Sequence, residues 1–221
     1  MLASLPATLL LDFDGTLADS QPAIVATVQH TFALQGMAPP DPAAIRQIIG
    51  YGLGKGFAIL APELSPEAIQ ECVRIYRQHY PSADEKTQLY PGARELLATV
   101  KQRGIPMILV SNKTETALLA ALERLGILSY FDHVFGEIPG QPLKPDPALY
   151  HTKIQPHAGD PQSNLLVGDT PTDIRFAQNL GMPVVWASFG YGSATDCLPL
   201  QPTYTVSSLV DLKNFFVERG C

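Results

Sequence analysis

The chain of 221 residues has few charged side chains, and basic ones are scarcest. Charged residues make up 16% of the chain, against about 25% in ordinary soluble proteins, whereas hydrophobic residues make up 46%. This composition excludes an intrinsically disordered chain and a solvated coiled coil. The net charge of -6, without any cluster of Lys and Arg, excludes a nucleic-acid-binding surface. We therefore expect a globular protein with no nucleic-acid partner.

Cysteine is also scarce, and the three cysteines, Cys72, Cys197 and Cys221, lie far apart. None belongs to a C-x-x-C pair, so the sequence encodes neither a disulfide framework nor a zinc site. The five histidines form no H-x-H or H-E-x-x-H pair, which leaves them as solvated or core residues. A reduced, cytoplasmic setting fits this pattern best.

Long apolar runs are missing as well. The run Leu9–Leu11 is stopped by Asp12, and no stretch approaches the ~20 residues that span a bilayer. The first basic side chain is Arg46, so the N-terminus lacks the positively charged start of a secretory signal. We therefore expect no membrane partner and a soluble, intracellular protein.

Short apolar runs, in contrast, recur along the chain, and each ends in polar or glycine residues. They are Thr8–Phe13, Pro106–Val110, Asn164–Val167 and Pro183–Trp186. Such runs are typical of buried strands, and helical spacing of apolar residues precedes each of the last three. Strands that alternate with helices predict an α/β fold with a doubly wound parallel sheet.

Residues 20–80 depart from this alternation, because they show helical spacing but no convincing strand. Ser65 and Pro66 form a strong helix start, with Ser65 as the N-cap and Pro66 at the first helical position. We therefore expect an inserted all-helical cap at residues 18–87. The α/β core would then consist of residues 1–17 and 88–221.

Polar side chains follow three of the predicted strands, at the edge where open parallel sheets bind their ligands. They are Asp12, Asp14 and Thr16 after the first strand, Ser111 and Asn112 after the second, and Asp169 and Asp173 after the third. Lys144 lies in a loop between the second and third of these strands. Carboxylates, a hydroxyl and a lysine at one sheet edge suit Mg²⁺-assisted phosphoryl transfer.

Each of these groups also has a purely structural interpretation. Asp14-Gly15 is a common turn dipeptide, and Ser111 and Asp169 are typical helix N-caps. Asp173 also fits a solvated carboxylate in a first helical turn, and Lys144 fits an ordinary surface lysine. Capping and function are compatible, so the weight of each residue depends on the others around it.

Taken together, four segments resemble the ordered motifs of the haloacid dehalogenase superfamily. They are Asp12-Phe13-Asp14-Gly15-Thr16, Ser111-Asn112, Lys144-Pro145-Asp146-Pro147 and Gly168-Asp169-Thr170-Pro171-Thr172-Asp173. Four motifs in this order, over nearly the whole chain, are far more specific than any one alone. The resemblance implies a Rossmann-like core and a two-step, Mg²⁺-dependent phosphatase.

The resemblance also implies a role for each carboxylate. Asp12 would be the nucleophile that forms an aspartyl-phosphate, and Asp14 the acid for the leaving group and the base for water. Asp12 and Asp169 would bind Mg²⁺ through side chains, and Asp14 through its backbone carbonyl. Asp173 would be a ligand or would support one. True dehalogenases of the superfamily lack the second aspartate, so Asp14 favours phosphate chemistry.

The remaining motif residues would contact the substrate. The resemblance implies that Thr16, Ser111 and Lys144 hold the phosphoryl group and position the acid and base. Asn112, next to Ser111, is included among the substrate-binding residues. These assignments make the sheet edge responsible for the chemistry rather than for the choice of substrate.

The helical insert resembles the caps of the phosphoglycolate phosphatase and β-phosphoglucomutase branches. Such caps close over small substrates, so we expect the insert to determine specificity. Its glycine-rich segment Gly50–Gly56 fits no nucleotide-binding motif. This segment is either a flexible connector or a backbone that approaches a substrate carboxylate, with Gly52 and Lys55 as substrate-binding residues.

The leading hypothesis is a Mg²⁺-dependent phosphatase of a small phosphorylated metabolite, with 2-phosphoglycolate as the first candidate. A phosphosugar phosphatase or β-phosphoglucomutase-like enzyme is the alternative within the family. A catalytically silent scaffold is a third reading, which the complete set of mutually repelling carboxylates weakens. The sequence leaves monomer and homodimer equally open.

Overall fold

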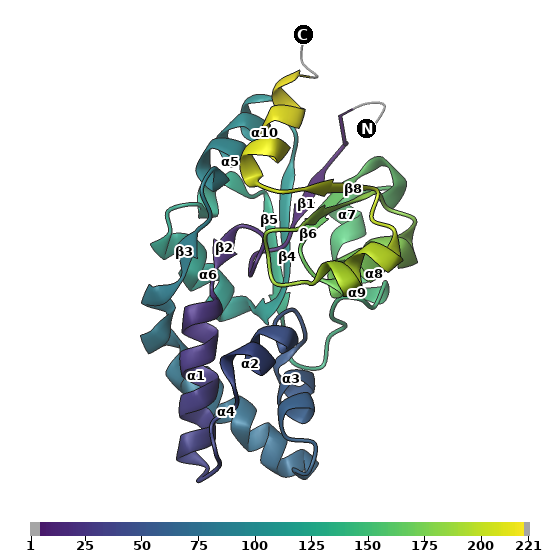
Figure 1. Cartoon of the computed structure of the whole chain (residues 1–221). Helices are drawn as coiled ribbons and strands as arrows, with labels where there is room; N and C mark the ends of the chain where they lie inside the picture. Colours follow the sequence, from purple (N-terminus) through teal and green to yellow (C-terminus); the bar gives the residue numbers. More distant parts are fainter. Residues whose placement is uncertain (1–4, 219–221) are drawn as a thin grey trace.

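The structure is a computed structural model that describes residues 5–218, with a sheet packed between helices above a helical bundle (Figure 1). The six strands of the main sheet follow the order β5-β4-β1-β6-β7-β8 and pair in parallel. Their bounds are β1 Leu9–Leu11, β4 Met107–Thr114, β5 His133–Glu137, β6 Leu165–Gly168, β7 Val184–Ala187 and β8 Tyr204–Val206. From β1 the strand numbers increase toward both edges, through β4 to β5 on one side and through β6 and β7 to β8 on the other. This order confirms the predicted doubly wound α/β fold.

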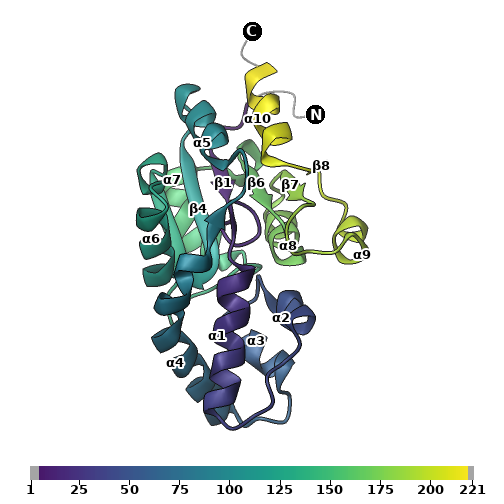
Figure 2. The same ribbon diagram turned by 60° about the vertical axis from the view of Figure 1, so that its left-hand side comes forward.

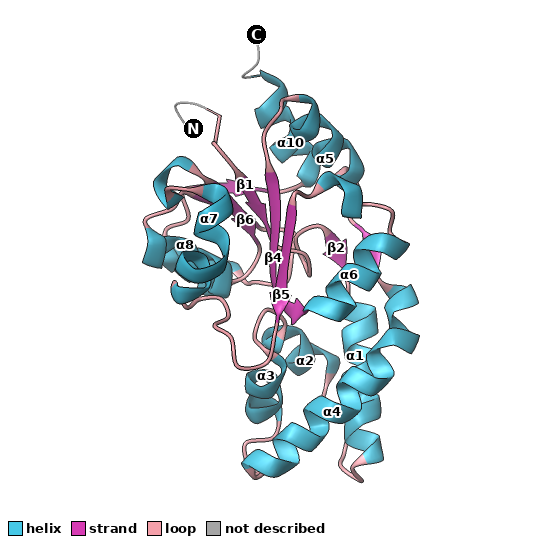
Figure 3. Ribbon diagram, turned by 180° about the vertical axis from the view of Figure 1, so that it is seen from behind, coloured by secondary structure: helices cyan, strands magenta, loops and turns pink. Residues whose placement is uncertain are grey.

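Helices cover both faces of this sheet, as Figures 2 and 3 show. The longer covering helices are α5 Ala93–Gln102, α6 Glu115–Arg124, α8 Pro171–Leu180 and α10 Leu209–Glu218, and the shorter ones are η3 Tyr150–Ile154, α7 Gln155–Ala158 and α9 Ala194–Cys197. Leu9 and Leu11 pack with α5, α6 and α10, whereas Leu10 packs with η3 and α8 on the other face. Because β1 is buried on both faces, its sequence is uniformly apolar.

The two outermost strands, β5 and β8, were not predicted. Both lie at edges of the sheet, and none of their residues is fully buried. Edge strands bury less surface than central ones, so their sequences mix polar and apolar residues and lack the continuous apolar run. In β5, His133, Gly136 and Glu137 interrupt that signal.

Residues 21–83 form a bundle of helices with a hydrophobic core of its own. The helices are α1 Gln21–Leu34, α2 Pro42–Ile48, α3 Leu53–Leu60 and α4 Pro66–Ala83. The Ser65 hydroxyl caps α4 by accepting from the N–H of Ala68, at the predicted start. The glycine-rich segment is more than a connector, because Gly52 is the N-cap of α3.

The two chain segments that join this bundle to the sheet lie side by side. β2 Ala18–Asp19 and β3 Gln88–Leu89 pair antiparallel, with Ala18 opposite Leu89. Arg124 of α6 fastens the returning segment, since its guanidinium donates to the Asp84 carboxylate and to the backbone oxygens of Asp84 and Thr87. The chain thus leaves and re-enters the core at one place. The boundaries at residues 17/18 and 87/88 stay a prediction.

Two of the three cysteines, Cys72 and Cys197, are buried free thiols. Cys221 lies outside the described residues. Between residues 5 and 218, no helix combines the length and the apolar character that crossing a membrane requires.

Candidate active site

Side chains from four separate segments meet at the carboxyl edge of the sheet. Asp12 follows β1, Asp169 follows β6, Ser111 and Asn112 lie in β4, and Lys144 comes from the loop after β5. Each of the five is at most 6% exposed. They meet because β1 pairs with β4 on one side and with β6 on the other.

Asp12, Asp169 and Asp173 form a buried carboxylate cluster, in which one oxygen of each residue lies within 4.8 Å of the others. Burial, together with the nearby Asp173 and Asp14 and against an attraction from Lys144, raises the pKa of Asp12 to about 7. Burial, with Asp173 and Asp12, also raises the pKa of Asp169 well above its ordinary range. Ionised carboxylates are therefore unfavourable here without a compensating charge.

Lys144 supplies one such charge. Its Nζ lies 2.6 Å from Asp173 Oδ1 and 2.9 Å from Asp12 Oδ1. Burial alone would lower the pKa of Lys144, but the two carboxylates raise it above its ordinary value. The contact with Asp12 is an ion pair outside hydrogen-bond geometry, so the buried Asp12 Oδ1 accepts no hydrogen bond from the described residues. One ammonium thus contacts two of the three carboxylates of the cluster.

The cluster fits a divalent metal ion. Hard cations take carboxylate oxygens as ligands, and the converging oxygens of Asp12, Asp169 and Asp173 include one that lacks a hydrogen bond. Asp173 has the contacts of a supporting residue as well. Its Oδ2 accepts from the N–H and hydroxyl of Thr170, and its Oδ1 accepts from Lys144. The Asp14 carboxylate is outside the cluster.

The turn after β1 holds Asp169 in place. Gly15 has a φ of +84°, and a Cβ there would lie 2.2 Å from Asp169 Oδ2, so only glycine fits. The Thr16 hydroxyl donates to Asp169 Oδ1 at 3.1 Å, and the Tyr191 N–H donates to Oδ2 at 2.7 Å. Thr16 was expected to hold the phosphoryl group, but the structure places its hydroxyl against Asp169 and outside the lining of the cavity described next.

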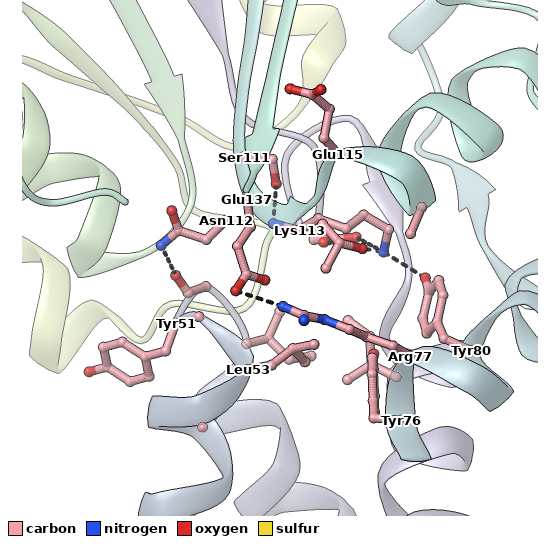
Figure 4. Close-up of a pocket in the computed structure, with 18 of the residues that line it drawn as sticks. Tyr51, Leu53, Tyr76, Arg77, Tyr80, Ser111, Asn112, Lys113, Glu115 and Glu137 are labelled. Atoms are coloured by element: carbon pink, nitrogen blue, oxygen red, sulfur yellow. Dashed lines mark hydrogen bonds and ion pairs between the residues drawn. The ribbon is translucent and has the colours of Figure 1, made fainter. Parts of the chain in front are cut away.

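A cavity of about 820 Å³ separates the sheet edge from the helical bundle (Figure 4). Asp12, Asp14, Ser111 and Lys144 line it from the core, and α1, α3 and α4 line it from the bundle. The cavity therefore gives a ligand simultaneous contact with the cap and with four of the five predicted catalytic residues, all but Thr16.

The structure brings one of the two predicted cap residues to this cavity. Gly52 lines it, whereas Lys55 is exposed, with its Nζ 4.3 Å from the centre of the Tyr51 ring. The helical geometry of α3 explains the difference. Gly56 and Phe57 point inward and are buried, which leaves Lys55 on the outer side of the helix.

Asn112 acts as a link between segments rather than as an open ligand. Its Nδ2 donates to the backbone oxygens of Gly50 and Lys144, at 3.0 and 2.9 Å, and its Oδ1 accepts from the Lys144 N–H at 3.0 Å. Both donors of the amide are thereby occupied. Ser111, in contrast, lines the cavity, and its Oγ accepts only the Lys113 N–H, at 3.3 Å, among the described residues.

Sequence reasoning missed the other polar residues of the cavity. Lys113 Nζ lies 3.2 Å from Asp14 Oδ1 and donates to the Tyr80 hydroxyl, and Arg77 donates to Glu137 at 3.0 Å. Lys113 directly follows Ser111-Asn112, and this position next to a motif was the one feature of the sequence that could have indicated a role for it. Tyr80 and Arg77 had none, because only the folded cap brings α4 opposite the sheet.

Comparison with known proteins places these motifs in a family. Residues 9–187 match the haloacid dehalogenase-like hydrolase family. A phosphoglycolate phosphatase of Rhodospirillum rubrum is 33% identical, over 85% of this chain and 81% of that protein, and one of Nitrosococcus oceani is 31% identical, over 97% and 98%.

Solved structures agree with this placement. A haloacid dehalogenase-like family hydrolase from Streptococcus pneumoniae superposes with a TM-score of 0.86 at 28% identity, covering 97% of this chain and 100% of that one. The family match spans most of the chain and includes all four motifs. This chain therefore belongs to the haloacid dehalogenase-like hydrolases.

Proposed function

We propose that this hydrolase is a Mg²⁺-dependent phosphatase that converts 2-phosphoglycolate to glycolate and phosphate through an aspartyl-phosphate. The observation that carries the proposal is the position of Asp12 at the end of β1, where its carboxylate meets Asp169, Asp173 and Lys144. Similarity to phosphoglycolate phosphatases supports the choice of substrate.

In the first step, a carboxylate oxygen of Asp12 attacks phosphorus, and the bond from phosphorus to the ester oxygen breaks. Asp14 donates a proton to the departing glycolate oxygen. In the second step, Asp14 takes a proton from water, which attacks the aspartyl-phosphate and releases inorganic phosphate.

The reaction needs positive charge at the carboxylate cluster and at the phosphoryl oxygens, because both are negatively charged. When bound, Mg²⁺ supplies charge to the carboxylate cluster and to the phosphoryl oxygens. Lys144 and the Ser111 hydroxyl bind the other phosphoryl oxygens and orient the group toward Asp12. The cavity above the sheet edge holds the rest of the ester and, with the cap docked, limits the access of water.

The test is phosphate release from a panel of esters, with and without EDTA. We expect 2-phosphoglycolate to be the preferred ester, EDTA to abolish its hydrolysis, and Asp12→Asn to lower kcat by at least about 10³-fold. Asp160→Asn is the matched control, because Asp160 is exposed and, within residues 5–218, its carboxylate accepts only the Gln162 N–H.

Other outcomes contradict parts of the proposal. Activity that survives Asp12→Asn contradicts the covalent step, and activity that survives EDTA contradicts the metal requirement. Preferred hydrolysis or isomerisation of glucose 1-phosphate favours the phosphosugar alternative. A folded wild-type protein that releases phosphate from no ester favours the scaffold.

A further inference from the structure

We infer that Lys113, held between Asp14 and Tyr80, is the cation that recognises the carboxylate of the substrate and so selects it among small phosphate esters. This inference rests on the proposed function and adds to it the residue that binds the carboxylate of the glycolate leaving group.

Lys113 lines the cavity from the core. It belongs to β4, and its side chain is 7% exposed. Its Nζ donates to the Tyr80 hydroxyl at 2.6 Å and lies 3.2 and 3.5 Å from the two carboxylate oxygens of Asp14 (Figure 4). An ammonium group has three donors, and these two side chains are its hydrogen-bond partners among the described residues. The two Asp14 oxygens belong to one carboxylate and lie at 3.2 and 3.5 Å, so a single N–H can serve both and the third N–H can turn to a ligand in the cavity.

The chemistry of the substrate places the group that binds its carboxylate close to Asp14. In 2-phosphoglycolate, one CH₂ group separates the carboxylate from the ester oxygen. Asp14 must come within hydrogen-bond distance of that ester oxygen to protonate it. The group that binds the carboxylate must consequently lie close to Asp14, and the Lys113 ammonium does.

The other cations that line the cavity are committed elsewhere. Lys144 is held by Asp12 and Asp173 on the phosphoryl side. Arg124 donates twice to the Asp84 carboxylate, at 3.0 and 2.9 Å, and also to backbone oxygens of the returning segment. Arg77 pairs with Glu137, and its side chain is 36% exposed. Lys113 is thus the lining cation that contacts Asp14.

The surroundings of Lys113 strengthen its attraction for an anion. The Nζ lies 4.2 Å from the centre of the Tyr80 ring and 5.8 Å from that of Phe13. The Lys113 side chain is also only 7% exposed, so water screens its charge less than at the surface and an ion pair there is stronger. Tyr80 belongs to α4 of the cap, and a carboxylate bound here lies at the junction of cap and core.

The test compares two esters that differ only in the group that Lys113 would bind. Ethyl phosphate carries a methyl group where 2-phosphoglycolate carries its carboxylate. We expect Lys113→Met to lower the ratio of the two kcat/KM values by about 10- to 100-fold in favour of ethyl phosphate, the effect of losing a charge-assisted hydrogen bond. Lys113→Arg should restore part of the ratio, since it keeps the charge.

Two controls make the result specific. Lys86→Met should leave the ratio unchanged, because Lys86 is exposed and its side chain makes no hydrogen bond or ion pair to the rest of residues 5–218. Product inhibition provides a second readout that requires no chemical step. Lys113→Met should raise the inhibition constant for glycolate by about 10-fold or more and leave that for inorganic phosphate essentially unchanged.

Three outcomes separate this inference from the proposed function. Equal loss of activity toward both esters in Lys113→Met, with glycolate inhibition retained, would show that Lys113 only positions Asp14 and would overturn the inference. A wild-type enzyme that treats both esters alike would also overturn it. If the wild-type enzyme hydrolyses neither ester, or if Asp12→Asn stays active, the proposed function itself fails.

Discussion

At the scale of single residues, the absence of a side chain at Gly15 is as important as the carboxylates around it. Gly15→Ala would place a Cβ 2.2 Å from Asp169 Oδ2, at a φ of +84°. We expect near-complete loss of phosphatase activity and a loss of stability above the ~1 kcal/mol of backbone strain alone. Urea unfolding and phosphate release measure the two effects.

The matched control for this change is Gly140→Ala. Gly140 has a φ of +80°, but nothing lies within 4 Å of the Cβ that alanine would add. The control therefore carries the same backbone strain without the collision. Equal effects of the two substitutions would contradict the importance of the contact with Asp169.

The titration of Asp12 gives a second prediction at this scale. Burial raises its pKa from 3.8 to about 7, so without metal the folded state binds this proton more tightly than the unfolded state. The carboxyl consequently destabilises the fold as the pH rises from 3.8 to about 7. In EDTA, we expect Asp12→Asn to be more stable than wild type by a few kcal/mol above pH 7, and the difference to vanish near pH 4. Urea unfolding across this range measures it, and a pH-independent difference would contradict it.

At the scale of elements, the loop after β7 connects the carboxylate cluster to the start of the cap. The Tyr191 N–H holds Asp169, while its hydroxyl accepts from the N–H groups of Ser20 and Gln21 and donates to Asp19. One residue thus contacts both the cluster and the segment through which the chain enters α1.

Removal of that hydroxyl tests this connection. Tyr191→Phe leaves the buried Ser20 N–H without its acceptor, and we expect a loss of about 1–3 kcal/mol in the free energy of unfolding. Tyr204→Phe is the control, because the Tyr204 hydroxyl forms no hydrogen bond in the described part of the chain. Equal losses in the two variants would show that the contact contributes nothing specific.

Elements of the fold differed in how far they could be predicted from sequence. β1 and β6 followed from continuous apolar runs, because both strands are buried on both faces. β2 and β3 have two residues each, and their pairing depends on contacts between distant parts of the chain. The motif carboxylates could be located because strand ends place them, whereas the contact of Lys113 with Tyr80 depends on how the cap packs against the core.

At the scale of the whole molecule, metal binding should increase the free energy of unfolding and raise Tm. The carboxylate cluster repels itself without a cation, so a ligand that binds only the folded state stabilises it by about 2.7 kcal/mol at 100 times its Kd. For a chain of this size, we expect Mg²⁺ to raise Tm by about 5–10 °C over EDTA. Differential scanning calorimetry measures the shift. Asp169→Asn should reduce it, and an undiminished shift in that variant would place the ion elsewhere. Assembly as a monomer or a homodimer stays a prediction.

The pairing of β2 with β3 brings the two ends of the cap together, so the cap can be removed or replaced at a single place in the fold. Ala18 and Leu89 are neighbours, so a chain without the segment between them could be closed by a short turn while β1 and α5 keep their places. The same adjacency allows a different insert to be joined to the two cut ends. Such an exchange would leave Lys113 and the carboxylate cluster in place, because these residues belong to the core and not to the cap.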